Sequence, residues 1–459
     1  MKLKSILSTV ISAIILASAV IPTDTIYSVA ADSSIRDMTT MEIITDMGSG
    51  INLGNTFETC GDWIVQWGDG TPNSYETGWG SPTITQEMMQ GYADAGFGVV
   101  RIPVAWSNMM SNDGNYTINP DYLARVTQVV NWALDADLYV IINLHWDGGW
   151  LEKLPENYDE CMKKYTTIWT QVSDAFRNYG DYLIFESQNE ELGWSSVWNQ
   201  WGGSSEKKEE SYGYVNAVNQ AFVNTVRSSG GNNEERHLLI SGYNTDITLT
   251  CDALFKMPDD PAGRCALSVH YYSPAGFALL TEDASWSKAS STWGTDADYQ
   301  ELNYYMDMLD ARYSSQGIPV IIGEYGCPKE NKEEESVRRF LTSVCEAAFS
   351  RGGICPVLWD TTGLHYDRST CRMTDSLLNS QLLEIRDKYI QKDTPIQSVQ
   401  GDVNGDSIFS VSDVIMLQKF LLGKGHLTNW QNGDFCPDGK INIFDLCLMK
   451  KELISLRTQ

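Results

Sequence analysis

The sequence predicts an α/β chain: a (β/α)8 TIM barrel followed by a small, mainly α-helical domain. Two observations predict the barrel, namely eight short apolar runs rich in β-branched residues and the amphipathic helical stretches between them. A third observation, a 32-residue repeat near the C-terminal end, predicts the small domain. A length of 459 residues with 42% hydrophobic residues suits one large and one small domain.

The first 30 residues have the features of a secretory signal peptide. Lys2 and Lys4 form a basic start, residues 6–21 are apolar, and Ser28-Val-Ala30 offers small residues for cleavage. An uncleaved membrane anchor is the alternative interpretation. No later apolar run is long enough to span a bilayer, so we expect no membrane insertion after cleavage. Export would permit disulfides among the ten cysteines, but the sequence does not pair them and shows no metal-ligand spacing.

The net charge narrows the class of partner. At pH 7 the formal charge is −27, which disfavours nucleic acid and anionic membranes as partners. A neutral polymer such as a polysaccharide would not be repelled.

The barrel is expected within residues 34–390. Helical patterns such as Asp121–Ala136 and Leu302–Ser314 separate the apolar runs. An open doubly wound sheet is the alternative, but no Gly-rich phosphate loop follows the first strand. The eight expected strands are Gly50–Gly54, Val99–Val104, Leu138–Leu144, Tyr182–Ser187, His237–Ser241, Ala266–His270, Pro319–Gly323 and Ile354–Trp359.

Two glutamates, Glu190 and Glu324, each stand just beyond one of these apolar runs. Carboxylates at the C-terminal ends of barrel strands lie in the catalytic mouth. Two converging carboxylates are the minimal equipment for cleaving a glycosidic bond. The alternative is that both are ordinary loop acids, since the chain has 60 Asp and Glu residues.

Polar and aromatic residues follow several other strands at the same predicted end of the barrel. For each of them a structural role is the alternative; His270, for instance, could be a hydrogen-bonded core histidine. Flat indoles stack on pyranose rings, so we expect the tryptophans of 194–201 to contact sugar, and Trp132 and Trp169 to lie in the core. The expected substrate-binding residues are Asn55, Arg101, His145, Asn189, His270, Tyr272 and Trp359.

These motifs resemble glycoside hydrolase family 5, and within it the bacterial endoglucanases of the branch that also contains xyloglucanases. The resemblance implies a retaining endo-β-1,4-glucanase that needs no cofactor, with Glu190 as acid/base and Glu324 as nucleophile. Xyloglucan, mannan or xylan as main substrate and a non-catalytic carbohydrate-binding protein are the alternatives. The motifs are Asn52-Leu-Gly-Asn-Thr56, Arg101-Ile-Pro-Val104, Ile141-Ile-Asn-Leu-His145, Phe185-Glu-Ser-Gln-Asn-Glu190, His270-Tyr-Tyr272 and Gly323-Glu-Tyr-Gly326.

The chain departs from the family pattern at two positions. Glu191 stands where the family usually has Pro, so Glu186, Glu190 and Glu191 compete for the acid/base role. Spacing from Phe185 and the neighbouring Asn189 favour Glu190. Trp146 replaces a second histidine often found after the position of His145, which predicts fewer polar contacts to the sugar.

After a polar, proline-containing linker at residues 391–400, residues 401–457 contain two twelve-residue loops with the oxygen-ligand pattern of a calcium site. Ser407 replaces the usual Gly in the first loop, and Cys436 is a poor calcium ligand in the second. Solvated acidic turns are the alternative. Helices are expected at Val414–Leu422 and Leu446–Ile454. The expected ligands are Asp402, Asn404, Asp406, Ile408, Ser410 and Asp413, then Asp434, Asp438, Lys440, Asn442 and Asp445, with Ile408 and Lys440 offering carbonyl oxygens.

The duplicated loop and helix resemble a type I dockerin. The resemblance implies structural Ca²⁺, a cohesin domain of a scaffoldin as partner, and a secreted, extracellular protein in a cell-surface cellulosome. A regulatory EF-hand pair is the alternative, but a clear helix before each loop is missing. Loop positions 10 and 11, which help select the cohesin in dockerins, are Val411-Ser412 and Ile443-Phe444.

Overall fold

The computed structural model describes residues 33–190, 198, 205–390, 399–404, 408–425, 427, 429–436 and 440–456. The predicted signal peptide and most of the predicted linker lie outside these residues. Among the residues described, no helix is both long enough and apolar enough to cross a membrane. All ten cysteines are described, and all are free thiols.

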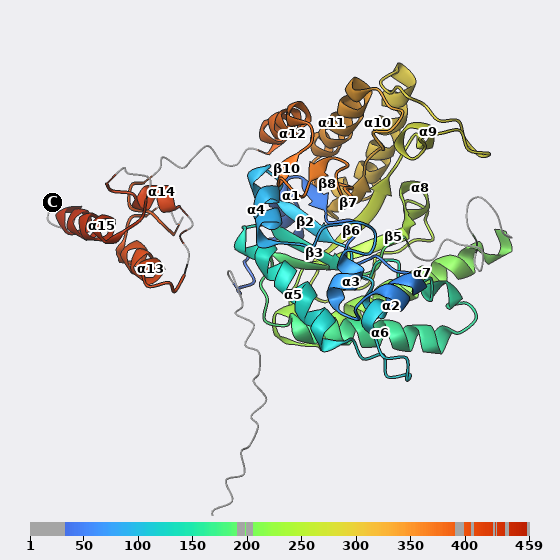
Figure 1. Cartoon of the computed structure of the whole chain (residues 1–459), viewed down its shortest axis with the longest axis horizontal. Coiled ribbons are helices and arrows are strands. Elements are labelled where there is room, and N and C mark those ends of the chain that lie inside the picture. Colours follow the sequence, from blue (N-terminus) through green and yellow to red (C-terminus); the bar gives the residue numbers. More distant parts are fainter. Residues whose placement is uncertain are drawn as a thin grey trace, which may run out of the picture.

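Eight parallel strands close into a barrel in chain order, with helices around it (Figure 1). Every predicted strand is present, which confirms the predicted fold class, although most ends differ by one or two residues. The strands are β1 Gly50–Asn52, β2 Val99–Ile102, β3 Tyr139–Asn143, β4 Leu183–Glu186, β5 Leu238–Asp246, β6 Cys265–Tyr271, β7 Val320–Tyr325 and β8 Ile354–Leu358.

Helices follow the strands, and local sequence sets where several of them begin. Thr39 and Thr295 each form a capping box with an acidic residue three positions later, at Glu42 and Asp298. The helices of this domain are α1 Thr40–Met47, α2 Asp62–Trp67, α3 Pro72–Glu76, α4 Gln86–Asp94, α5 Pro120–Asp135, α6 Tyr158–Ala175, α7 Lys208–Ser228, α8 Ile247–Thr250, α9 Ala275–Ala278, α10 Asp296–Arg312, α11 Glu334–Arg351 and α12 Ser376–Tyr389. A two-stranded sheet, β9 Tyr366–Asp367 and β10 Arg372–Met373, lies beyond β8.

The barrel interior changes from apolar to polar along the strands. Val99, Ile141 and Ile184 belong to a core cluster that also contains residues of α1, so α1 packs against this end of the interior. Side chains two positions further along a strand point to the same side of the sheet. Arg101 and Glu186 therefore face the interior one layer above these apolar residues.

Irregular pairing near the ends of β6 and β7 positions the second carboxylate. The register shifts between Val269 and His270, and His270 then pairs with Glu324. Such irregularities re-aim side chains and are common beside active sites. The sequence-based strand ended at Gly323, which is wrong: Glu324 lies inside β7.

The C-terminal domain has its own small core, built from Val403, Val414, Leu417, Leu427, Leu446 and Met449. Its helices are α13 Val411–Leu421, α14 Trp430–Gly433 and α15 Ile443–Leu456. The two long helices begin three residues earlier than predicted. For α13 the reason is a capping box between Ser410 and Asp413. The four-residue α14 precedes the second loop.

Candidate active site

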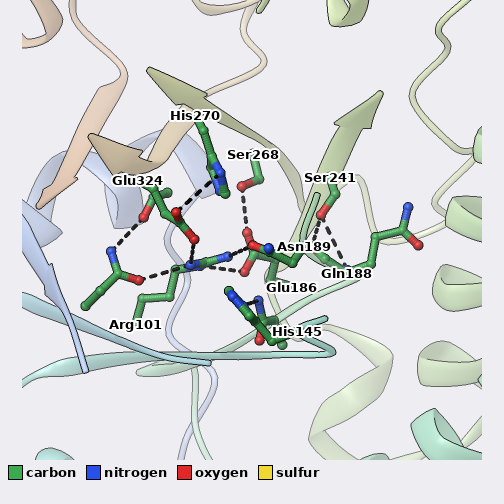
Figure 2. Close-up of polar contacts among 12 residues, drawn as sticks. Arg101, His145, Glu186, Gln188, Asn189, Ser241, Ser268, His270 and Glu324 are labelled. Atoms are coloured by element: carbon green, nitrogen blue, oxygen red, sulfur yellow. Dashed lines mark hydrogen bonds and ion pairs between the residues drawn. The ribbon is translucent and has the colours of Figure 1, made fainter. Parts of the chain in front are cut away.

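The Arg101 guanidinium lies at the centre of a buried network at the C-terminal end of the barrel (Figure 2). Its Nε donates to Glu186 at 2.7 Å and its Nη1 to Glu324 at 2.8 Å and to Asn52 at 3.0 Å. Its Nη2 donates to Asn189 Oδ1 at 2.8 Å. Burial lowers the pKa of Arg101, but the charges of Glu186 and Glu324 outweigh that effect and raise it. Arg101 is therefore a permanent cation that fixes several strand ends at once.

Glu324, from β7, receives a hydrogen bond on each carboxylate oxygen. Arg101 binds Oε1, and the Tyr272 hydroxyl donates to Oε2 at 3.0 Å. Burial raises the pKa of Tyr272 well above its usual range, so the phenol stays a donor. These two bonds hold Glu324 in one orientation.

Glu190, just beyond β4, lies opposite Glu324. His270 Nδ1 is 2.7 Å from Glu190 Oε1 and 3.7 Å from Glu324 Oε2. One oxygen of Glu190, one of Glu324 and a ring nitrogen of His270 all lie within 4.8 Å of one another. The Glu190 side chain is 41% exposed, whereas that of Glu324 is 7% exposed. The pair thus consists of one open and one enclosed carboxyl.

Glu186, which competed with Glu190 in the sequence, is placed differently. It is fully buried, and besides its bond to Arg101 it accepts a 2.6 Å hydrogen bond from the Ser268 hydroxyl. A carboxylate so enclosed has no path to a leaving group in the mouth, which excludes Glu186 as the acid/base. The other competitor, Glu191, lies outside the described residues.

The two carboxyls of the pair influence each other's titration. Burial raises the pKa of Glu324, and the charge of Glu190 adds to that rise, whereas the charges of His270 and Arg101 lower it. Burial also acts to raise the pKa of Glu190, but the hydrogen bond and charge of His270, with the charge of Arg101, outweigh it and lower the pKa. Protons therefore leave the pair in two shared steps rather than from independent groups.

His145 and Trp359 form part of the wall beside this pair. Their rings are nearly parallel, 8° apart, with centroids 6.2 Å from each other. His145 Nδ1 lies 3.2 Å from the Asn143 side-chain amide. Burial, with the charges of Arg101 and His270, lowers the pKa of His145 well below its usual range, so its ring is neutral. Trp359 is half-buried, which leaves part of its ring accessible.

The remaining aromatic predictions divide between surface and core. Trp169 is fully buried and Trp132 packs against the main core, as predicted. Trp146 is 42% exposed. Of the 194–201 cluster, Trp198 is half-buried against Tyr212 and Tyr243, so much of its ring is already covered. Trp194 and Trp201 lie outside the described residues.

Sequence reasoning missed two groups that support the pair, Asn52 and Ser268. Asn52 accepts from Arg101 and donates to the Gly323 carbonyl at 2.8 Å, and Ser268 binds Glu186. The signal that could have found them is strand periodicity. Both occupy inward-facing positions two residues before the predicted strand ends, where a polar residue in a buried parallel strand is unusual.

In the C-terminal domain, the acids at loop position 12 tie each loop to its helix. Asp413 accepts from the backbone N–H groups of Val403, Asn404 and Ser410 at 2.8–3.2 Å. Asp445 accepts from those of Cys436 and Asn442 at 3.0 and 2.9 Å. Both carboxylates are fully buried and Asp402 is nearly so.

This oxygen-rich donor set fits a hard divalent cation such as Ca²⁺. Predicted ligands that the structure describes are Asp402, Asn404, Ile408, Ser410 and Asp413 in the first loop and Asp434, Lys440, Asn442 and Asp445 in the second. Asp406 and Asp438 lie outside the described residues.

Comparison with known proteins places the two domains in known families. The family model for cellulase, glycosyl hydrolase family 5, matches residues 65–363, and that for the dockerin type I domain matches residues 400–454. Endoglucanase B of Clostridium cellulovorans is 33% identical over 405 residues, covering 86% of each chain. A xyloglucan-specific endo-β-1,4-glucanase of Bacteroides ovatus is 37% identical over 365 residues, covering 75% of this chain and 70% of that protein.

Solved structures agree with this placement. A broad-specificity endoglucanase from an uncultured bovine rumen ciliate superposes with a TM-score of 0.69 at 33% identity, covering 76% of this chain and 99% of that one. A Bacteroides ovatus xyloglucanase in complex with a heptasaccharide superposes with a TM-score of 0.67 at 32% identity, covering 79% of this chain and 81% of that one.

Proposed function

The chain belongs to glycosyl hydrolase family 5 and carries a type I dockerin domain, and from this premise we propose that it is a secreted, retaining endo-β-1,4-glucanase. Endoglucanase activity on β-glucans follows from the family and from its endoglucanase relatives. We assign Glu190 as acid/base and Glu324 as nucleophile. The non-catalytic alternative is set aside, because the family is one of hydrolases.

One observation carries the mechanism: oxygens of Glu190 and Glu324 lie within 4.8 Å of each other. Retaining enzymes place their two carboxyl groups about 5–5.5 Å apart, so that one attacks the anomeric carbon directly. Inverting enzymes need about 6.5–9.5 Å to fit a water molecule between carboxyl and sugar. The spacing therefore favours retention.

In the first step Glu324 attacks the anomeric carbon while Glu190 protonates the departing glycosidic oxygen, so the proton that the free pair shares must reside on Glu190 when substrate is bound. Arg101 and Tyr272 aim Glu324 by their hydrogen bonds. Asn189 has its oxygen on Arg101, so its amide nitrogen is directed away from that bond and is suited to the sugar 2-OH. In the second step Glu190 removes a proton from water, the water oxygen bonds to the anomeric carbon, and the bond between that carbon and Glu324 breaks to release the sugar.

The other predicted substrate contacts receive more specific roles. Arg101 is wholly buried, so we assign it to positioning Glu324 rather than to direct sugar contact. His270 is buried, and its Nδ1 lies 2.7 Å from Glu190 Oε1, so we assign it to controlling the protonation of that carboxyl. Trp359, which is half-buried, offers an apolar face to a pyranose ring, and His145, Asn55 and Tyr272 offer polar contacts.

The substrate is the less constrained part of the proposal. A xyloglucan-specific relative has 37% identity, which keeps xyloglucan as the second candidate. Purified enzyme should be tested on carboxymethylcellulose, xyloglucan, mannan and xylan, with the product anomer followed by proton NMR. We expect the fastest hydrolysis on carboxymethylcellulose and initial β-anomer. A preference for xyloglucan would replace the substrate, and initial α-anomer would overturn the retaining mechanism.

Glu190→Ala tests the acid/base assignment. An aryl cellobioside with a good leaving group should still form the glycosyl-enzyme, because that step then needs little proton donation. Azide should accelerate turnover and give a β-glycosyl azide. Rescue of Glu191→Ala but not of Glu190→Ala would move the role to Glu191.

For the rest of the chain we propose a signal peptide at 1–30, a catalytic domain at 34–390, a linker at 391–400 and a dockerin at 401–457. The dockerin would bind structural Ca²⁺ through its loop carboxylates and then a cohesin domain of a scaffoldin, placing the enzyme in an extracellular cellulosome. Bound Ca²⁺ would neutralise the gathered carboxylates and order the loops. Asp413→Ala should abolish cohesin binding in a calcium-dependent pull-down, and unchanged binding would contradict this role.

A further inference from the structure

The loop after β1 contains a buried carboxylate that the mechanism does not use. Glu58 is 3% exposed, and its two oxygens accept hydrogen bonds from the backbone N–H groups of Asn55 and Thr56, the latter at 2.9 Å. Asn55 has φ of +59°, a left-handed conformation that few non-glycine residues adopt. We propose that Glu58 is a positioning residue that holds Asn55 in place for contact with substrate. The inference rests on the proposed function, which gives Asn55 a glucan to bind.

The peptide unit between Asn55 and Thr56 is also bonded through its carbonyl oxygen. The Ser81 hydroxyl donates to the Asn55 carbonyl oxygen at 2.6 Å. Ser81 Oγ also lies 2.7 Å from the Thr362 hydroxyl and accepts from Arg368 Nη1 at 3.3 Å. Both the N–H and the C=O of Asn55 are thus bonded to side chains. Thr362 and Arg368, which contact Ser81, belong to the segment after β8.

That segment begins with Trp359, so Asn55 and the aromatic wall are fixed to each other. Gly54 N donates to the Asp360 carbonyl at 3.1 Å, and Arg368 Nη2 donates to the same oxygen at 3.2 Å. A Cβ on Gly54 would lie 3.0 Å from the Trp359 ring and 2.6 Å from the Asp360 carbonyl oxygen. The chain therefore passes directly against the indole immediately before it reaches Asn55.

The chemistry of Glu58 suits this role better than a neutral side chain would. An ionised carboxylate offers two acceptor oxygens, one for each N–H, whereas an amide offers one acceptor and a donor that would face the second N–H. Burial raises the pKa of Glu58 to about 7, although the backbone hydrogen bonds and the charge of Arg368 lower it, so the ionised form with two acceptor oxygens predominates above about pH 7. Arg368 is 2% exposed and supplies the nearby positive charge.

The test measures cellohexaose affinity by calorimetry in the full chain carrying Glu324→Gln, so that no substrate is consumed. In that background Glu58→Gln and Asn55→Ala should each weaken binding about tenfold, since each removes roughly one hydrogen bond to substrate or its support. If Glu58 acts through Asn55, the double variant should bind no more weakly than Asn55→Ala alone. Additive losses would overturn the proposal. Ser81→Ala, a smaller change, should show the same non-additivity with Asn55→Ala.

Glu76→Gln is the matched control. Glu76 is also fully buried in this part of the chain, but it pairs with Arg125 at 2.7 Å and accepts from the Ile84 N–H. It should lower Tm without changing cellohexaose affinity, and a loss equal to that of Glu58→Gln would reduce Glu58 to a merely structural role.

If the chain carrying only Glu324→Gln fails to bind cellohexaose, that result counts against the proposed function rather than against the role of Glu58. Hydrogen exchange then decides the positioning itself: Glu58→Gln, but not Glu76→Gln, should speed exchange of the Asn55 and Thr56 amides. Unchanged exchange would overturn it.

Discussion

The barrel mouth and the C-terminal loops both bury carboxylates, but they stabilise them by different means. In the mouth, Arg101 pairs with Glu186 at 2.7 Å and Glu324 at 2.8 Å. In the C-terminal loops, Asp413 and Asp445 accept hydrogen bonds from backbone N–H groups at the start of α13 and α15 and from the loops before them.

The two sites therefore differ in the source of the positive charge that balances their carboxylates. The barrel supplies its own cation on a strand, so the geometry of Glu324 is established when the barrel folds. The loops gather anionic ligands in a pattern suited to Ca²⁺, so we expect the folding of the small domain to depend on an ion from solution. Among the described residues of the small domain, the core contains six buried side chains, and so small a core supplies little folding free energy of its own.

The largest expected effect is loss of activity when a carboxylate of the barrel mouth is replaced, whereas replacing one in the small domain should leave the activity unchanged. Glu324→Gln keeps the shape and the acceptor for Arg101 but removes the proposed nucleophile, so kcat should fall about 10⁴-fold or more. Steady-state hydrolysis of carboxymethylcellulose measures this, with Asp413→Ala as a control that should keep the wild-type rate. A Glu324→Gln enzyme with a tenth of wild-type activity would remove Glu324 from the role.

Replacing Arg101 by a neutral residue should lower the free energy of unfolding of the barrel. Arg101→Met leaves Glu186 and Glu324 buried without their partner, which should cost about 3–5 kcal/mol of stability. Denaturant unfolding of the catalytic domain, followed by tryptophan fluorescence, gives this value, because 14 of the 15 tryptophans precede the small domain. A cost below about 1 kcal/mol would show that the network is not held by this charge.

Removing Ca²⁺ should lower the stability of the small domain only. Ca²⁺ at a thousand times its Kd would stabilise the dockerin by about 4 kcal/mol, and a chelator should remove that amount. Calorimetry of the full chain should then show one transition moving to lower temperature while the barrel transition stays in place. If both transitions move together, or neither moves, the contrast between the two regions fails.

The smallest expected effect is a shift in pH dependence. His270→Asn removes the hydrogen bond and charge that lower the pKa of Glu190, so that pKa should rise. Because Glu190, as we propose, acts in its protonated form, the basic limb of the kcat/KM profile should move to higher pH. A basic limb that stays in place would mean that His270 does not control Glu190.

How far the sequence could predict the site is clear from individual residues. Apolar runs predicted all eight strands and hence which residues share the mouth, because the ends of parallel strands meet at one face of a barrel. Strand length was less predictable: Glu324 lies inside β7 because of irregular pairing with β6, which depends on a neighbour far away in sequence.

Local periodicity and motif spacing were enough to predict the barrel, the repeated loops and the candidate carboxylates from the amino-acid sequence. The three-dimensional arrangement was needed to show that Glu190 is more exposed than Glu186, that Arg101 is enclosed, and that Glu58 accepts a hydrogen bond from the Asn55 N–H. Burial and charge pairing are properties of side chains brought together from distant strands. A local pattern can place a glutamate at the end of a strand, but its surroundings decide whether it holds the site together or performs its chemistry.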